Sequence, residues 1–260
     1  VFPTWESYVK QFELLADSLP KAGAIIFDET DDMLDVIGRK ERADVVSTPY
    51  NVHPHKIENG KTILITAGQG EVPVLVFGSH NMKNISGAHA VCERLGVTDE
   101  DFYQAIQSFK GAAKRLELLG KSESVNVYRD FAHAPSKVEA TTTALKEQFP
   151  DRSLVACAEL HTFSSLNKAF LSQYRRKLKS ADIAIVYYNP LTLEHKKMES
   201  LSEEEVRTAF KRDDLKVFTD SSELAGYLKS LTWENANLLL MSSGTFGDLD
   251  LKKLAGEILA

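Results

Sequence analysis

The sequence predicts an α/β protein of two domains, the second built on a mostly parallel sheet. Its 260 residues are enough to bury two hydrophobic cores. After about residue 118, apolar runs alternate strictly with amphipathic stretches, the pattern of strands joined by covering helices. Before that point, helical segments surround a short region rich in hairpin turns, which indicates a separate domain.

The first part of the chain begins with apolar residues at helical spacing over 4–19, closed by a proline and a glycine. The run "AIIF" at 24–27 predicts a buried strand. Between about residues 43 and 77, "NG" and "GQG" separate short apolar runs, which predicts a small antiparallel region. Two helices are expected after it, at 80–95 and 99–109.

The second part is predicted to contain five strands and five helices. We place the domain boundary within "KGAAKRLELLGK" at 110–121, so that the domains are 1–112 and 113–260. Ser202 and Glu205 form a capping box at one helix start. The expected strands are 124–129, 153–158, 182–187, 215–218 and 237–241, and the helices are 136–148, 167–179, 202–211, 221–230 and 249–259.

The composition of the chain excludes several classes of protein. Hydrophobic residues make up 43% of the chain and charged residues 26%, as in an ordinary globular protein, and no apolar run approaches the roughly 18 residues of a membrane span. The net charge of -6 disfavours nucleic acid as a partner.

Cys92 and Cys157 are too far apart in sequence for a zinc knuckle or a disulfide framework, so we expect a cytoplasmic setting. Because the sequence begins with Val1, we expect it to be part of a longer protein.

Four polar loops follow strands of the second domain. In parallel sheets, ligands bind beyond the carboxyl ends of the strands, where such loops meet. Each loop taken alone is explained by a turn or a helix cap, but several that converge favour a ligand site. The loops read "RDFAHAPSK", "ELHTFSSLN", "YYNPLTLEHKK" and "MSSGTFGDLD".

Two other motifs do not predict sites. "GKT" at 60–62 resembles the end of a phosphate loop, but His55 stands where the motif requires glycine, and a strand is expected to follow. "HPH" at 53–55 offers two histidines without a third metal ligand. We therefore interpret the first as a hairpin and expect no metal at the second.

Three motifs in order carry a family resemblance: "GSHNMKNISGA" at 78–88, "FKGAAKRLELLG" at 109–120 and "RDFAHAP" at 129–135. They resemble the Mur ligases, ATP-dependent enzymes that add amino acids or peptides to UDP-N-acetylmuramate. The resemblance extends over essentially the whole chain. It departs from the family pattern at Lys114, where an arginine is usual, and at Ala134, where many members have histidine.

The resemblance implies that 1–112 is the carboxyl-terminal portion of the central ATP-binding domain and that 113–260 is the Rossmann-like carboxyl-terminal domain. It implies ATP and Mg²⁺ as cofactors, with the phosphate loop, the magnesium ligands and the UDP-sugar site upstream of this chain. We therefore expect this segment alone to be inactive. The implied partners are small molecules, namely UDP-N-acetylmuramate, an amino acid or murein peptide, and ATP, with no nucleic acid and no membrane.

The resemblance also implies roles for individual residues, none of which is a covalent nucleophile. Residues matching the family's nucleotide motifs are expected to bind ATP: His80, Asn81, Asn84, Lys114, Arg115, Asp130 and His133. Residues of the later loops are candidates for binding the incoming amino acid or peptide: His161, Thr162, Ser164, Ser165, Asn189, Ser243, Gly244 and Thr245.

The amine donor is predicted from the loops of the second domain. They resemble the branch that contains the L-alanine ligase and the tripeptide-recycling ligase, and "NPLTLEHKK" favours the tripeptide ligase. Two alternatives stay open: a folylpolyglutamate-synthase-like or cyanophycin-type ligase, and a non-catalytic nucleotide-binding or interaction module. The residues upstream of Val1 distinguish these possibilities.

Overall fold

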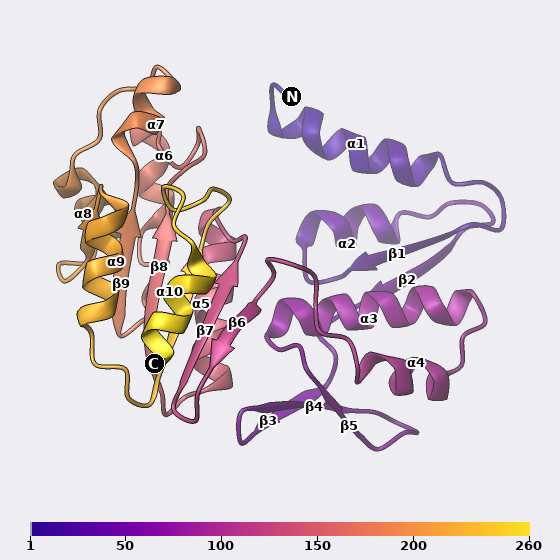
Figure 1. The fold of residues 1–260 in the computed structure, drawn as a ribbon. Helices are drawn as coiled ribbons and strands as arrows, with labels where there is room; N and C mark the ends of the chain where they lie inside the picture. The colour runs from indigo at the N-terminus through magenta and orange to yellow at the C-terminus, as the bar shows by residue number, and fades with distance from the viewer. Residues whose placement is uncertain (1) are drawn as a thin grey trace. The chain divides into compact units, whose positions relative to one another are not determined.

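Residues 2–260 are described by a computed structural model, in which the chain divides into two units, Val1–Phe109 and Lys110–Ala260 (Figure 1). The first unit holds a two-stranded and a three-stranded sheet. Its elements are α1 (Trp5–Asp17), β1 (Ala24–Asp28), α2 (Asp32–Arg39), β2 (Val46–Tyr50), β3 (His55–Glu58), β4 (Lys61–Ile65), β5 (Glu71–Val74), α3 (Ser79–Arg94) and α4 (Asp99–Ile106).

The antiparallel region of the first unit is confirmed as the sheet β3-β4-β5. Asn59 and Gly60 join β3 to β4 with φ values of 51° and 70°, the left-handed pair that a tight hairpin requires. Leu64 of β4 is fully buried, and this sheet forms a core with apolar side chains of α3 and α4. The "GKT" segment therefore lies in a hairpin, as predicted.

Two features of the first unit differ from the prediction. β2 pairs in parallel with β1 and is not part of the antiparallel region. The helix α2 was not predicted, because with 8 residues it is too short to show a clear helical repeat; it begins where Asp31 accepts hydrogen bonds from two main-chain amides. A crossover through α2 explains the parallel pairing, since parallel strands cannot be joined by a tight turn.

The second unit has a six-stranded sheet in the order β10-β9-β8-β11-β7-β6, parallel except for the edge strand β6. The mostly parallel α/β fold is thus confirmed. Its elements are β6 (Glu117–Lys121), β7 (Val125–Asp130), α5 (Pro135–Gln148), β8 (Ser153–Glu159), α6 (Lys168–Leu171), the 3-10 helix η1 (Ser172–Tyr174), β9 (Ile183–Tyr187), α7 (Pro190–His195), α8 (Glu203–Phe210), β10 (Lys216–Phe218), α9 (Ser221–Ser230), β11 (Ala236–Met241) and α10 (Leu251–Leu259).

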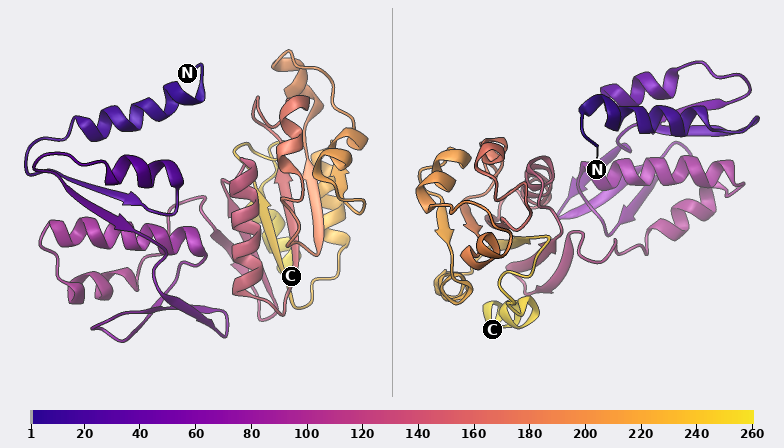
Figure 2. Two further views of the ribbon diagram at one scale, coloured as in Figure 1. Left: turned by 180° about the vertical axis from the view of Figure 1, so that it is seen from behind. Right: turned by 90° about the horizontal axis from the view of Figure 1, so that it is seen from above.

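Helices cover both faces of this sheet. α10 lies in front of the sheet in Figure 1, and α5 lies in front of it in the reverse view of Figure 2. Alternate residues of the central strands, such as Val155 and Leu238, pack against Leu224 of α9 and Leu254 of α10. On the α5 side, Thr142 contacts the sulfur of Met241 at 3.8 Å. The central strands are buried on both faces, which explains their continuous apolar sequences.

The predicted helix 167–179 is wrong in length. α6 ends at Leu171 and is followed by a single 3-10 turn. Tyr174 is 1% exposed and stacks on Phe210, and its hydroxyl donates a hydrogen bond to the carbonyl of His133. Arg176 then adopts a φ of 60°, which ends helical continuation. Tertiary packing of Tyr174 therefore overrides the helical spacing of this segment.

The capping box of Ser202 and Glu205 is confirmed at the start of α8. In contrast, α7 was expected to be a polar loop; its first turn holds Pro190, and Asn189 caps it. None of the helices within residues 2–260 combines the length and apolar character needed to cross a membrane.

Candidate functional site

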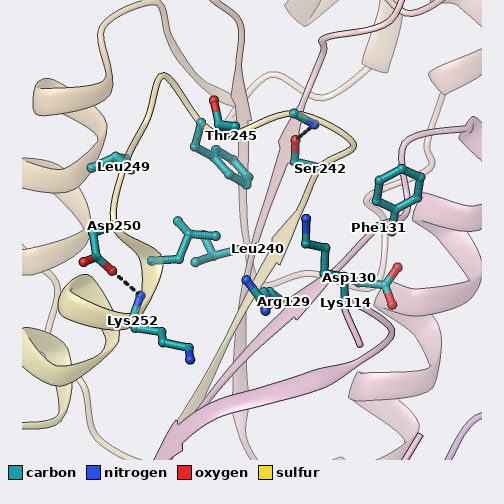
Figure 3. Close-up of a pocket in the computed structure, with 13 residues that line it drawn as sticks. Lys114, Arg129, Asp130, Phe131, Leu240, Ser242, Thr245, Leu249, Asp250 and Lys252 are labelled. Atoms are coloured by element: carbon teal, nitrogen blue, oxygen red, sulfur yellow. Dashed lines mark hydrogen bonds between the residues drawn. The ribbon is translucent and has the colours of Figure 1, made fainter. Parts of the chain in front are cut away.

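A cavity of about 300 Å³ lies in the second unit where β7 and β11 end and α10 begins (Figure 3). This is the edge of the parallel sheet at which a ligand site was expected. Three cationic side chains line it, Lys114, Arg129 and Lys252. The other lining residues are Asp130, Phe131, Leu240, Ser242, Gly244, Thr245, Phe246, Leu249, Asp250 and Leu251.

Asp130 builds the turn that closes one side of this cavity. Its carboxylate is 8% exposed and accepts hydrogen bonds from the amides of Leu116, at 2.7 Å, and Ala132, at 2.6 Å. The amide of Phe131 donates to the carbonyl of Lys114 at 2.8 Å. The motif "RDFAHAP" is therefore a turn tied to the segment before β6.

The three cationic side chains of the cavity differ in whether they form an ion pair with a carboxylate. Arg129 donates to Glu117 through Nε at 2.9 Å and Nη2 at 3.1 Å, and Glu117 also accepts from the amide of Lys114 at 2.8 Å. The hydrogen bond from Arg129, with that from the Lys114 amide, lowers the pKa of the Glu117 carboxyl. Within residues 2–260, no carboxylate forms an ion pair with Lys114 or Lys252. These two ammonium groups are available to an anionic ligand.

Two predicted nucleotide contacts of the second unit lie outside the cavity lining. Arg115 is exposed, and its amide donates to the carbonyl of Ala112 at 3.1 Å. His133 is half-buried, with Nδ1 2.9 Å from the carbonyl of Phe131. Of the four predicted residues in this unit, the structure brings Lys114 and Asp130 together in the cavity lining.

The other predicted nucleotide contacts belong to the first unit, at the start of α3. Asn81 is half-buried and donates from Nδ2 to the carbonyl of Phe77 at 2.8 Å, while Asn84 is exposed. His80 is half-buried. Lys83, between the two asparagines, pairs with Asp28 at 3.0 Å at the end of β1. The asparagines therefore flank a charged pair on the first turns of this helix.

In the loop after β8, polar side chains form hydrogen bonds within the loop's own turn. The Thr162 amide donates to Ser165 Oγ at 2.9 Å, and the Ser165 amide donates to Thr162 Oγ1 at 3.1 Å. Ser165 is fully buried, whereas Ser164 is exposed. Asn189 similarly caps α7 by accepting from the amide of Leu191 at 2.9 Å. These hydrogen bonds stabilise a turn and a helix cap, which was the alternative to a ligand site for each of these loops.

The loop after β11 contributes directly to the cavity. Gly244 and Thr245, both predicted, are among the lining residues, and so are Ser242 and Phe246 of the same predicted loop. The hydroxyl of Ser243 is buried and has no hydrogen-bond partner among residues 2–260. Of the predicted substrate-binding residues, the structure thus places Gly244 and Thr245 in the lining of the cavity.

Sequence reasoning missed four polar residues at this edge of the sheet. Glu159 ends β8 and is 3% exposed; its signal was a carboxylate at the end of the apolar run "LVACAEL". Arg129 stands beside Asp130 within a quoted motif. Asp250 caps α10 by accepting from the amides of residues 252 and 253 at 3.0 Å each, and Lys252 follows it into the cavity lining.

The described residues do not form a metal centre. Within residues 2–260, no three His, Cys, Asp or Glu side chains come together in a group that could hold a metal ion. His53 is buried with Nε2 2.8 Å from the Tyr103 hydroxyl, and His55 Nδ1 lies 2.8 Å from the carbonyl of His53. The residues present therefore do not fit a magnesium site by themselves, and ligands from outside this chain stay a prediction.

Comparison with known proteins agrees with these features. The family model "Mur ligase, glutamate ligase domain" matches residues 114–244. The UDP-N-acetylmuramate–L-alanine ligase of Desulfitobacterium hafniense (strain Y51) is 28% identical over 197 residues, which cover 71% of this chain and 43% of that protein. The chain thus spans less than half the length of this relative.

Three solved structures share the fold. The UDP-N-acetylmuramate-alanine ligase of Thermotoga maritima has a TM-score of 0.67 at 15% identity, covering 99% of this chain and 55% of that one. The murein peptide ligase of Psychrobacter arcticus has 0.58 at 20%, covering 96% and 54%. A folylpolyglutamate synthase of Mycobacterium tuberculosis has 0.65 at 17%, covering 98% and 61%. With the family model matched over residues 114–244, the chain belongs to the Mur ligase family.

Proposed function

We propose that this chain is part of an ATP-dependent carboxylate-amine ligase that joins an amino acid or murein peptide to UDP-N-acetylmuramate. Family membership and the names of the similar proteins support this proposal. The observation that carries it is the cavity at the ends of β7 and β11, where Lys114 and Lys252 offer ammonium groups to anionic reactants.

The proposed reaction has two steps. A carboxylate oxygen of UDP-N-acetylmuramate attacks the γ-phosphorus of ATP, which releases ADP and forms an acyl phosphate. The amine nitrogen then attacks the acyl carbon, inorganic phosphate leaves, and the nitrogen loses a proton. No protein nucleophile is needed, so the residues of this chain orient anionic reactants and offset charge. When bound, magnesium offsets charge on the phosphates.

We propose that the two parts of the chain contribute differently. Residues 1–112 correspond to the end of the central ATP-binding domain, where His80, Asn81 and Asn84 contact the nucleotide. In 113–260, the carboxyl-terminal domain, the residues proposed to contact the nucleotide are Lys114, Arg115, Asp130 and His133. The hydrogen bond of 2.8 Å from the Phe131 amide to the Lys114 carbonyl supports grouping Lys114 with Asp130.

For the amine donor, we propose a preformed murein tripeptide in preference to L-alanine, which would serve peptidoglycan recycling. The curated relatives are L-alanine ligases and favour the other choice. Two properties of the cavity support the peptide: its volume of about 300 Å³ exceeds what L-alanine fills, and Lys252 has no ion pair within residues 2–260. A tripeptide carries additional carboxylates that such a cation would bind.

The test compares the two amines in the complete ligase. ADP release is measured with saturating ATP and UDP-N-acetylmuramate while either amine is varied. We expect kcat/KM for the tripeptide to equal or exceed that for L-alanine. A large preference for L-alanine would assign the protein to the other branch, without changing the reaction class.

Because the phosphate loop is expected upstream, we propose that the 260-residue chain alone lacks ligase activity and binds ATP weakly. Isothermal titration of this chain with ATP checks this point, and micromolar affinity would contradict it. We also propose that this activity is cytoplasmic, since its proposed substrates are ATP and UDP-N-acetylmuramate.

A second candidate is a folylpolyglutamate-type ligase, favoured by the TM-score of 0.65 to such a synthase. It would use the same acyl-phosphate chemistry on a folate carboxylate. Replacing UDP-N-acetylmuramate by a reduced folate, with glutamate as the amine, separates the two. ADP release with the folate and glutamate but not with UDP-N-acetylmuramate would favour the second candidate, and a folded full-length protein that releases no ADP with either substrate would favour a non-catalytic module.

A further inference from the structure

Glu159 is a buried carboxylate that the proposed reaction does not use. It is the last residue of β8 and is 3% exposed, at the end of a strand that is otherwise apolar over its buried positions. Removing a carboxylate from water is costly unless hydrogen bonds or a cation compensate it. No lysine or arginine within residues 2–260 pairs with Glu159. Its burial must therefore be compensated by hydrogen bonds from neutral groups.

Its contacts come from two different loops. Oε2 accepts hydrogen bonds from the Ser242 hydroxyl and from the Phe246 amide, the latter at 2.9 Å. Oε1 lies 3.7 Å from Nδ1 of His161 in the loop after β8. Glu159 therefore connects the ends of β8 and β11 through groups some 83 to 87 positions apart in sequence.

The loop that Glu159 contacts has an unfavourable backbone. Phe246, Gly247 and Asp248 have φ values of 53°, 65° and 63°, three successive left-handed residues of which two carry a Cβ. This region is disfavoured for residues other than glycine and persists where surrounding contacts enforce it. Phe246 is 1% exposed and stacks on Tyr187, and its amide is the one that donates to Glu159.

The same loop is closely packed over Glu159. The amide of Gly244 donates to Ser242 Oγ at 2.6 Å. A Cβ at Gly244 would lie 2.7 Å from Cγ of His161 and 2.9 Å from Oε2 of Glu159, too close for any side chain. Four residues of this loop, Ser242, Gly244, Thr245 and Phe246, line the cavity, so the position of Glu159 sets the shape of one cavity wall.

We propose that Glu159 is a positioning residue that fixes the loop 242–248, with its left-handed segment 246–248, and thereby shapes the binding site for the amine donor. One oxygen of this side chain accepts two hydrogen bonds, and both donors belong to the loop. This inference rests on the proposed function for its consequence in catalysis. Its structural part, the restraint of the loop, does not depend on that function.

The structural part is tested on the 260-residue chain by amide hydrogen exchange. In Glu159→Ala we expect the Phe246 amide to exchange at least about ten times faster than in the wild type, because its acceptor is lost. Glu159→Gln keeps one acceptor oxygen and should show a smaller increase. Glu139→Gln is the matched control, a half-buried glutamate on α5 that pairs with Lys177 and Lys179. Unchanged exchange at Phe246 in Glu159→Ala would overturn the proposal.

The catalytic consequence is tested in the complete ligase. Glu159→Gln should raise KM for the amine on the order of ten-fold and leave KM for ATP within about two-fold, as expected when one hydrogen bond to a charged group is weakened. Glu159→Ala should be worse than Glu159→Gln. A merely structural role predicts a lower melting temperature with unchanged KM values in the folded enzyme, and that result would overturn the positioning role.

The two proposals fail separately. A wild-type ligase without any amine-dependent ADP release contradicts the proposed function, whereas the exchange rate of Phe246 still decides whether Glu159 restrains the loop. If ligation occurs and the KM for ATP rises as much as that for the amine, the assignment of this cavity wall to the amine donor is wrong.

Discussion

The carboxylate of Asp130 and the main-chain amide of Leu116 are joined by a 2.7 Å hydrogen bond that spans 14 positions of sequence. The contact ties the end of β7 to the segment before β6, and the second carboxylate oxygen binds the amide of Ala132 at 2.6 Å. Asp130 thus builds one side of the cavity with both oxygens.

Replacing this carboxylate should lower stability. Asp130→Asn keeps the size of the side chain but offers one acceptor oxygen for two buried amides. We expect the free energy of unfolding of the second unit to fall by about 1.5–3 kcal/mol, the cost of losing a hydrogen bond to a charged group. Urea unfolding followed by circular dichroism measures it, with the exposed Asp151→Asn as control. A change no larger than that of the control would show that the turn does not need the charge.

The Glu117–Arg129 pair predicts a pH dependence. Hydrogen bonding by Arg129 lowers the pKa of Glu117 in the folded protein, so the folded state binds fewer protons than the unfolded state as the pH falls toward the pKa. The stabilisation is therefore present above the unfolded pKa of about 4.3 and is lost as the pH falls through the folded value. The paired side chains are 26% and 29% exposed, which limits the effect to about 1 kcal/mol or less.

The measurement is urea unfolding of the wild type and Glu117→Gln between about pH 6 and pH 3. The stability difference between them should be largest near pH 6 and shrink toward pH 3. Glu123→Gln, an exposed glutamate beyond β6, is the matched control and should follow the wild type. A difference that grows on acidification would contradict the sign of the shift.

Two helical glycines predict opposite effects of the same substitution. A Cβ at Gly38 in α2 would lie 2.4 Å from the Phe27 ring, whereas no atom lies within 4 Å of a Cβ at Gly226 in α9. Gly38→Ala should therefore destabilise the first unit by about 1–3 kcal/mol through overpacking. Gly226→Ala should stabilise the second unit by about 0.5–1 kcal/mol, because alanine favours helices. Thermal unfolding of each variant measures these changes. A change of melting temperature in the same direction for both variants would contradict the close packing of Gly38 against Phe27.

Two adjacent lysines of α10 allow a test of whether the cavity binds the amine donor. Lys252 lines it and Lys253 does not, although both are exposed and both amides bind Asp250. In the complete ligase, Lys252→Ala should raise KM for the tripeptide about 10-fold, a loss on the order of 1.4 kcal/mol for one charged contact. Lys253→Ala should leave KM within about two-fold. Equal effects of the two variants would mean that the cavity does not bind the amine donor.

The sequence predicted what depends on local pattern. The continuous apolar runs of the second domain identified the parallel strands, and Ser202 with Glu205 identified the start of α8, because both signals lie within a few residues. The helix at 167–179 failed because the packing of Tyr174 on Phe210 joins segments that are distant in sequence. α2 and α7 were missed because each is short and depends on a polar cap, which resembles a loop in sequence.

The candidate site was predictable only in part for the same reason. Loop positions at strand ends located Gly244 and Thr245, since topology alone brings such loops to one edge. Glu159 was missed because its significance lies in contacts with Ser242 and Phe246, more than 80 positions away. Lys252 looked like a surface residue of an amphipathic helix, and only the fold shows that its side chain lines the cavity.

The central claim is that this chain forms part of a ligase that uses UDP-N-acetylmuramate. The most direct measurement is mass spectrometry of the products after the complete ligase is incubated with UDP-N-acetylmuramate, ATP and equal concentrations of murein tripeptide and L-alanine. We predict a UDP-N-acetylmuramoyl-tripeptide adduct at least as abundant as the L-alanine adduct, formed in equal amount with ADP. Absence of any UDP-N-acetylmuramoyl adduct from a folded, ATP-binding protein would contradict the account.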